Sequence, residues 1–243
     1  MTELVPEAAL VETITRRLID VRGRMKAAHG RSEVGGPAPR LIGVSKRHPL
    51  DTLVAAGAAG LEDFGENYAQ ELRDKLSAWS SDAHRWHFIG ALQSNKLKYM
   101  VGRVQLIHTV DRASLIHAID RRAASQGLVQ DFLVQVDLAD ESQKAGISPS
   151  DLSALLDVCG QTEHGAARCV GLMIIPPAGT PEHTRRWFRA LRELRDALLG
   201  GPERARVDLR ELSMGMSADF EVAIEEGATL VRVGTALFGP RPG

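Results

Sequence analysis

The chain of 243 residues is long enough for one large barrel domain or for two small domains. Its composition, 44% hydrophobic and 25% charged, is that of an ordinary globular protein. With 30 basic and 31 acidic residues the net charge is −1, which argues against a broad nucleic-acid surface and gives no sign of attraction to membranes.

The N-terminal segment carries acids and arginines where a signal peptide would be apolar, and no segment has the roughly 18 uncharged apolar residues of a membrane helix. Cys159 and Cys169 fit neither a metal spacing nor a disulfide framework. We therefore expect a cytoplasmic protein in which both thiols are reduced and buried.

An apolar stripe opens the chain and predicts a long helix with one buried face. The stripe consists of Leu10, Ile14, Leu18, Val21 and Met25. The glycine- and proline-rich stretch from Gly30 to Pro39 predicts a loop that leads into the first strand.

After this loop, short β-branched or aromatic runs alternate with stretches of helical periodicity. The predicted strands are Leu41 to Ser45, Leu61 to Gly65, Trp86 to Ile89, Leu106 to Val110, Phe132 to Asp137, Val170 to Ile175, Leu209 to Ser213 and Thr229 to Val233. The helices between them are expected to begin near Leu50, Asn67, Gln93, Asp111, Pro149, Pro181 and Ser217.

These elements predict a single (β/α)8 barrel domain over residues 1–243, in which residues 1–40 form an N-terminal helix and loop. The helices between strands leave one place in the outer ring, which the N-terminal helix can fill. The alternative is an open doubly wound sheet. Its glycine-rich dinucleotide turn is missing, because Val44-Ser45-Lys46-Arg47 follows the first strand.

In such a barrel the functional residues lie at the carboxyl ends of the strands, and Lys46 and Arg232 stand out. Lys46 ends an apolar run, and a lysine amine at a barrel mouth can form a Schiff base with a carbonyl compound. Arg232 lies inside an apolar strand and needs an anion, a carbonyl or a ring acceptor, unless it forms a buried salt bridge. Because the first and eighth strands are neighbours, both cations are expected to face one small site.

Two turns of small residues predict a phosphate-binding site after strands seven and eight. They are Ser213-Met214-Gly215 and Gly234-Thr235, which offer backbone N–H groups and hydroxyls. We interpret Ser217 as the N-cap of the following helix, with Asp219 in its first turn, and not as a ligand.

The histidines of the chain have no metal-binding spacing, so no zinc site is predicted. His87 and His108 fall on predicted strands, and we interpret them as core imidazoles that are satisfied by hydrogen bonds.

Several motifs, in order along the chain, resemble the pyridoxal phosphate homeostasis protein family. They are VSKRHP, FGENYAQEL, WHFIGALQSNK, QKAGI, GLMIIPP and LSMGMSADFEVAIEEGATLVRVGTALFG. The resemblance implies the barrel of the alanine racemase N-terminal domain, standing alone, that binds pyridoxal 5′-phosphate without established catalysis.

The resemblance also assigns roles to individual residues. It implies that Lys46 forms the Schiff base, that Arg232 faces the pyridine nitrogen and that Asn67 lies near the ring. Lys144 matches a second lysine that handles the cofactor. Ser213, Gly234 and Thr235 match the phosphate cradle, with Met214 close by.

By this resemblance the chain is expected to be a monomeric, non-enzymatic carrier that takes part in intracellular cofactor homeostasis, with apo-enzymes as partners and neither nucleic acid nor membrane. The alternative is an amino-acid racemase of the alanine racemase type, which needs a second acid/base opposite Lys46. A third possibility is a cofactor-free lysine aldolase that acts on a sugar phosphate and shares Lys46 and the phosphate turns.

Overall fold

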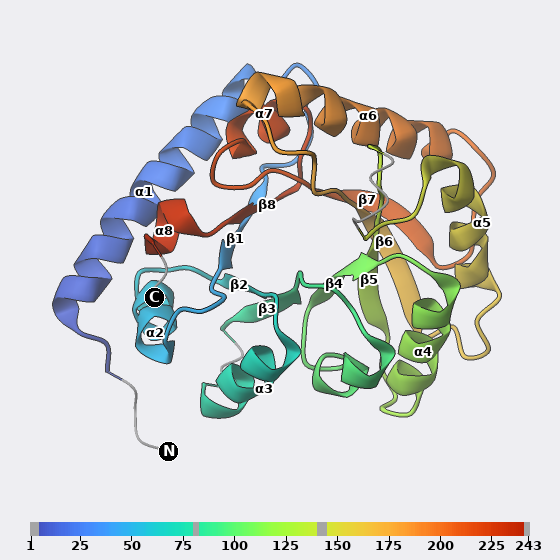
Figure 1. Cartoon of the computed structure of the whole chain (residues 1–243), viewed down its shortest axis with the longest axis horizontal. Coiled ribbons are helices and arrows are strands. Elements are labelled where there is room, and N and C mark those ends of the chain that lie inside the picture. Colours follow the sequence, from blue (N-terminus) through green and yellow to red (C-terminus); the bar gives the residue numbers. More distant parts are fainter. Residues whose placement is uncertain (1–4, 80–82, 140–144, 241–243) are drawn as a thin grey trace.

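The strands of the protein close into a parallel barrel in which each strand pairs with its neighbours in chain order (Figure 1). The computed structural model describes residues 5–79, 83–139 and 145–240. The strands are β1 (Arg40–Val44), β2 (Asp63–Glu66), β3 (Arg85–Phe88), β4 (Leu106–Val110), β5 (Gln130–Gln135), β6 (Ala167–Met173), β7 (Val207–Ser213) and β8 (Leu230–Val233). The predicted barrel is confirmed.

Helices alternate with the strands and cover the outside of the barrel (Figure 1). They are α1 (Ala8–Arg31), α2 (Leu50–Ala58), α3 (Ala69–Ala78), the 3-10 helix η1 (Ser94–Tyr99), α4 (Ala113–Ala124), α5 (Pro149–Gly160), α6 (Pro181–Leu199), α7 (Phe220–Glu225) and α8 (Thr235–Phe238). The stretch predicted near Gln93 is thus a tight 3-10 helix, and the short α8 was not expected.

Helix α1 completes the outer ring, as the sequence predicts. It packs against α2, α7 and α8, and Figure 1 shows it running along the flank of the barrel beside α8. Its apolar stripe is the buried face: Ile14, Leu18, Val21 and Met25 are all buried. The N-terminal helix therefore takes the place that the helices between strands leave open.

The strand boundaries differ from the predicted ones by a few residues, and β5 shows why. The prediction starts this strand at Phe132, whereas in the structure it begins with the polar residues Gln130 and Asp131. In the structure Gln130 is buried and donates to the carbonyl of Val104, while its side-chain oxygen accepts from the amide of Gly102. A polar side chain whose hydrogen bonds are satisfied can begin a buried strand.

The pairing registers decide which side chains point into the barrel. Ile42 of β1 is in register with Arg232 of β8 and with Asp63 of β2, so these three side chains lie on the same face of the sheet. A small apolar cluster fills part of this interior: Ile42, Leu106, Leu133, Val170, Met173 and Leu230. The larger apolar core lies between the outer face of the barrel and the helices.

Both cysteines are free and buried, as expected, and burial raises the pKa of the Cys159 thiol to about 12. Within the ranges that the structure describes, no helix combines the length and the apolar character that crossing a membrane requires.

Candidate functional site

A cavity of about 300 Å³ opens where the strands end at the carboxyl side of the barrel. This volume is at the lower end of the range for pockets that bind small molecules. The residues that line it come from the ends of β1, β2, β3, β6, β7 and β8: Val44, Lys46, His48, Asn67, Ile89, Ile175, Met216, Ser217, Ala218, Arg232, Gly234 and Thr235. The position is the one that (β/α)8 barrels use for function.

Most of the residues predicted for the site meet in this cavity. Lys46, Asn67, Arg232, Gly234 and Thr235 all line it. Lys46 and Arg232 come together because β1 and β8 are paired in the closed barrel. The two cations therefore line one cavity, in agreement with the neighbouring positions of the first and eighth strands.

The remaining predicted residues are placed differently. Ser213 and Met214 are fully buried, and neither is among the described residues that line the cavity. Lys144 lies outside the described residues. Met216 and Ser217, which lie three residues further along the same loop, line the cavity, and Ser213 and Met214 do not.

A buried lysine on α3 fixes the turn that carries Lys46. The side-chain amine of Lys75 on α3 donates to the carbonyl of Ser45 at 2.8 Å and to Glu66 Oε1 at 2.6 Å. The hydroxyl of Ser45 donates to the same oxygen of Glu66 at 2.6 Å. The residue directly before Lys46 is thereby bonded through its main chain and its side chain.

The residue after Lys46 is held as well. Arg47 adopts the left-handed backbone conformation, with φ of 64°, which costs free energy for any residue other than glycine. Its amide donates to Glu71 Oε1 at 2.7 Å, and Glu71 also accepts from Lys75. Sequence reasoning missed Glu66, Glu71 and Lys75, because their role depends on α3 packing under the turn.

Glu66 is an unusual carboxyl group at the base of this turn. It is fully buried, and burial raises its pKa in spite of the favourable interaction with Lys75. Its second oxygen, Oε2, has no hydrogen-bond partner among the described residues. Glu66 therefore depends on the amine of Lys75 to remain ionised in the core.

Arg232 is buried in the barrel, and its guanidinium is fixed by two acceptors. Nη1 donates to the hydroxyl of Ser213 at 2.6 Å, and Nη2 donates to the carbonyl of Ile174 at 2.9 Å. Burial lowers its pKa to about 10, against the attraction of Asp219, so it stays cationic at neutral pH. No described carboxylate forms the salt bridge that was the alternative interpretation of this arginine.

The prediction that Ser217 caps a helix is wrong. Its hydroxyl accepts from the amide of Gly234 at 3.2 Å and from the amide of Ala236 at 3.5 Å, so it links the turn after β7 to the turn after β8. Helix α7 begins later, after Asp219, whose carboxylate accepts from the amide of Met216. Because Ser217 uses its oxygen as an acceptor, its own proton is available for an anion in the cavity.

Asn67 is positioned by a close contact between two backbones. A Cβ atom at Gly90 would lie 1.9 Å from the carbonyl oxygen of Asn67, so only glycine allows this approach. The side-chain oxygen of Asn67 is buried, and no described residue gives it a hydrogen bond. An unsatisfied acceptor on the cavity wall indicates a place where a ligand donor can bind.

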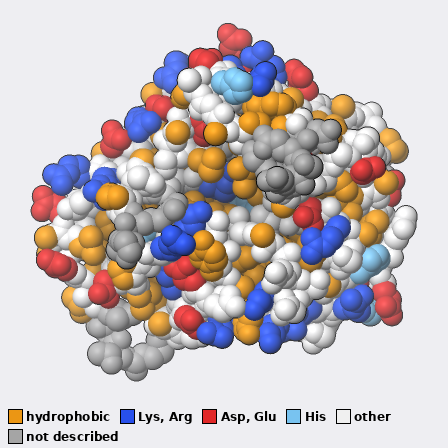
Figure 2. All heavy atoms as spheres, viewed as in Figure 1, with side chains coloured by type: hydrophobic (Ala, Val, Ile, Leu, Met, Phe, Trp, Pro, Cys, Tyr) orange, Lys and Arg blue, Asp and Glu red, His pale blue; other side chains and the backbone are white. Residues whose placement is uncertain are grey.

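The described residues contain no cluster of histidine, cysteine or acidic side chains that could hold a metal ion. His87 and His108 are fully buried and hydrogen-bonded, so their interpretation as core imidazoles is confirmed. Figure 2 shows the face viewed in Figure 1, with lysine and arginine side chains near its centre beside hydrophobic ones. An amine, a guanidinium and a hydroxyl beside apolar walls can bind a small anionic carbonyl compound.

Residues 27–242 match the family model described as alanine racemase, N-terminal domain. A pyridoxal phosphate homeostasis protein of Aquifex aeolicus is 44% identical over 226 residues, which cover 93% of this chain and 97% of the relative.

Solved structures agree with this similarity. PipY of Synechococcus elongatus, solved with PLP bound, is 37% identical with a TM-score of 0.80, covering 93% of this chain and all of PipY. Alanine racemase of Corynebacterium glutamicum is 12% identical with a TM-score of 0.66, and the match covers 62% of that enzyme. At this identity the second likeness shows the fold alone.

Proposed function

Since the chain belongs to the pyridoxal phosphate homeostasis protein family, we propose that it binds pyridoxal 5′-phosphate (PLP) in the cavity at the barrel mouth. It would hold the cofactor reversibly and take part in cofactor homeostasis inside the cell. The observation that supports this most directly is that Lys46 and Arg232 line one cavity with the turns after β7 and β8.

The residues of the cavity fit the chemical groups of PLP. The amine of Lys46 can condense with an aldehyde to a Schiff base with loss of water, which is the reversible covalent chemistry this cofactor supplies. Arg232 would hold the ring nitrogen. The side-chain oxygen of Asn67 can accept a hydrogen bond from a hydroxyl group on the ring, because no described residue donates to this buried oxygen.

The phosphate group fits the turns after β7 and β8. Gly234 and Thr235 were predicted for this role, and both line the cavity. Ser217 adds a hydroxyl whose oxygen already accepts two amides, so that it can donate to an anion. We propose that Ser217, Gly234 and Thr235 hold the phosphate, and that Ser213 acts through Arg232. Lys144 remains a proposed cofactor residue on the grounds of family resemblance.

We propose that binding occurs without turnover of an amino acid. The names of the relatives describe homeostasis proteins and not enzymes. An arginine beside the pyridine nitrogen keeps it unprotonated, which makes the ring a weaker electron sink. Tyr68, a possible second acid/base, is 46% exposed, packs against Arg47 and is not among the described lining residues.

A titration with PLP followed by an exchange assay tests this function. We expect the chain to bind PLP with a new visible absorbance band, and hydroxylamine to release the cofactor. In deuterated water, a panel of amino acids should exchange its α-protons no faster with the loaded protein than with free PLP. Failure to bind PLP would overturn the proposed function. Exchange well above that of free PLP would contradict binding without turnover, as the racemase alternative predicts.

A further inference from the structure

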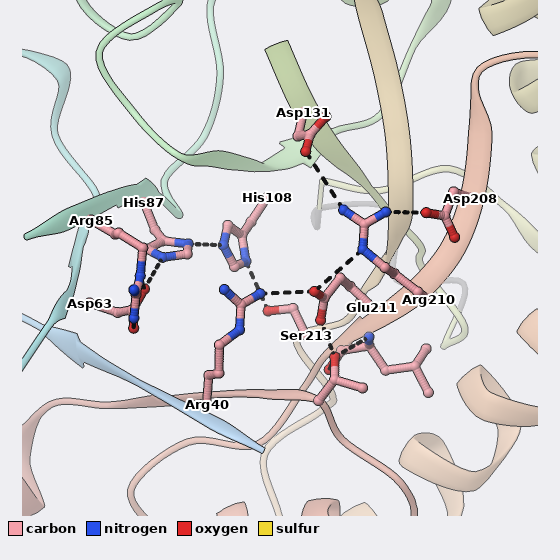
Figure 3. Close-up of polar contacts among 12 residues, drawn as sticks. Arg40, Asp63, Arg85, His87, His108, Asp131, Asp208, Arg210, Glu211 and Ser213 are labelled. Atoms are coloured by element: carbon pink, nitrogen blue, oxygen red, sulfur yellow. Dashed lines mark hydrogen bonds and ion pairs between the residues drawn. The ribbon is translucent and has the colours of Figure 1, made fainter. Parts of the chain in front are cut away.

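A continuous row of buried polar side chains crosses the barrel interior and ends at Arg232. Figure 3 shows its part from Asp63 to Ser213. Asp63 Oδ1 lies 2.9 Å from His87 Nε2, and His87 Nδ1 lies 3.0 Å from His108 Nε2. His108 Nδ1 lies 2.9 Å from the hydroxyl of Ser213, which in turn lies 2.6 Å from Arg232 Nη1. All these side chains are buried.

This row of hydrogen-bonded side chains connects the two ends of the barrel. Asp63 and Arg85 are the first residues of β2 and β3, at the end of the barrel opposite the cavity, and Arg85 binds both oxygens of Asp63. Arg232 lines the cavity itself. The row of hydrogen bonds therefore links an ion pair at one end of the barrel to the ligand cavity at the other.

The two terminal groups fix the direction of the hydrogen bonds at the two ends. Arg232 can only donate, because guanidinium has no acceptor. Asp63 can only accept when it is ionised. Although burial opposes ionisation, hydrogen bonds from Arg85 and His87 hold the pKa of Asp63 well below its usual range.

Between these ends, one arrangement of protons satisfies every group when both imidazoles are neutral. Arg232 donates to Ser213, and the Ser213 hydroxyl donates to Nδ1 of His108. Nε2 of His108 then donates to Nδ1 of His87, and Nε2 of His87 donates to Asp63. Each ring carries its proton on Nε2, so each histidine uses one nitrogen as an acceptor and the other as a donor.

The charges around the two imidazoles favour this neutral arrangement. Burial lowers the pKa of His87, in spite of the attraction of Asp63, and the cations Arg40 and Arg85 lower it further. Burial also lowers the pKa of His108, with contributions from His87, Arg232 and Arg40. Among these groups only Asp63 favours the charged form, and Arg85 already neutralises it.

We propose that Asp63, His87, His108 and Ser213 form a one-way hydrogen-bond chain that positions Arg232 for the ligand in the cavity. The Ser213 hydroxyl donates its proton to His108, so its rotation is fixed and its oxygen faces Nη1 of Arg232. The guanidinium is thereby held in one orientation. His87 and His108 are thus positioning residues: neither lines the cavity in the described part of the chain, and both act through Arg232.

NMR of protein with isotope-labelled histidine ring nitrogens tests the arrangement without any ligand. We expect His87 and His108 to be neutral with the proton on Nε2 from about pH 6 to about pH 8. A coupling across the hydrogen bond should connect Nε2 of His108 to Nδ1 of His87. A proton on Nδ1 of either ring, or a cationic ring at neutral pH, would overturn the proposal.

A second experiment tests the effect on Arg232, and it rests on the proposed binding of PLP. His108→Leu leaves the Ser213 hydroxyl without its acceptor, so we expect PLP to bind about tenfold more weakly, with a shifted absorbance band. The matched control is Gln130→Leu, which removes another buried polar side chain on a strand, outside the chain of hydrogen bonds. We expect this control to keep the band and the affinity.

The outcomes separate this inference from the proposed function. Equal affinity and an identical band in His108→Leu and Gln130→Leu would overturn the positioning role. A wild-type protein that binds no PLP would overturn the proposed function alone, and the NMR result would still decide whether the chain of hydrogen bonds exists. If His108→Leu does not fold, Ser213→Ala takes its place with the same expected loss.

Discussion

The side-chain amine of Lys75 lies 2.8 Å from the carbonyl oxygen of Ser45, the residue that directly precedes Lys46. A lysine on α3 thus fixes the main chain of the turn from which another lysine enters the cavity. The side chain of Lys75 is only 9% exposed, and its amine is neutralised by Glu66 and Glu71.

Replacing Lys75 should therefore destabilise the protein and weaken ligand binding. In Lys75→Met the buried Glu66 loses its cation, and we expect a loss of about 3 kcal/mol in the free energy of unfolding. Urea denaturation at neutral pH measures this loss, with Lys26→Met on the exposed face of α1 as control. The double variant Glu66→Gln with Lys75→Met should recover part of the stability; equal stability of the single and double variants would contradict the account.

Ser217→Ala tests the phosphate end of the cavity. Without the hydroxyl, the amides of Gly234 and Ala236 lose their acceptor and the anion loses a donor. We expect the affinity for PLP to fall about tenfold, while the affinity for pyridoxal, which has no phosphate, changes little. Titrations of the wild type and the variant with both compounds give the change in each affinity. An equal loss for both compounds would show that Ser217 supports the fold and not the phosphate.

The fully buried histidines His87 and His108 should make the fold sensitive to mild acid. Their folded pKa values are lowered, so both stay neutral in the folded chain, whereas the unfolded chain binds protons below the ordinary value of 6.5. Their contribution is therefore fully present above pH 6.5 and is lost as the pH falls. Between this value and the lowered folded pKa values we expect the unfolding free energy to fall by up to about 2.7 kcal/mol per pH unit for the pair.

Urea denaturation across this pH range measures the effect. The slope should become much smaller in the double variant His87→Leu with His108→Leu, where His84, whose pKa burial also lowers, leaves a residue of it. It should persist in His183→Gln, which changes an exposed histidine on α6. An unchanged slope in the double variant would show that other groups cause the loss of stability.

The barrel could be predicted from the sequence because its signals are local. Apolar runs such as Leu106 to Val110 recur between helical stretches, and the stripe from Leu10 to Met25 identifies the helix that closes the ring. The pairing of β1 with β8 then follows from closure, and with it the meeting of Lys46 and Arg232. Chain order alone therefore predicts much of the site.

The parts that could not be predicted depend on contacts between distant residues. Ser217 precedes a short helix and has an acid two residues later, so local rules favour a cap, yet its partners belong to the turn after β8. His87 and His108 were predicted as satisfied core residues. Their common direction toward Arg232 follows only from the registers of the strands.

The central claim is that Lys46 holds the cofactor covalently, and borohydride reduction followed by peptide mass mapping tests it most directly. We expect the wild-type protein loaded with PLP to yield one reduced adduct, on the peptide that contains Lys46. In Lys46→Ala that adduct and the visible band should be absent. An adduct of equal yield on another lysine in the wild-type protein, Lys144 included, would contradict the account.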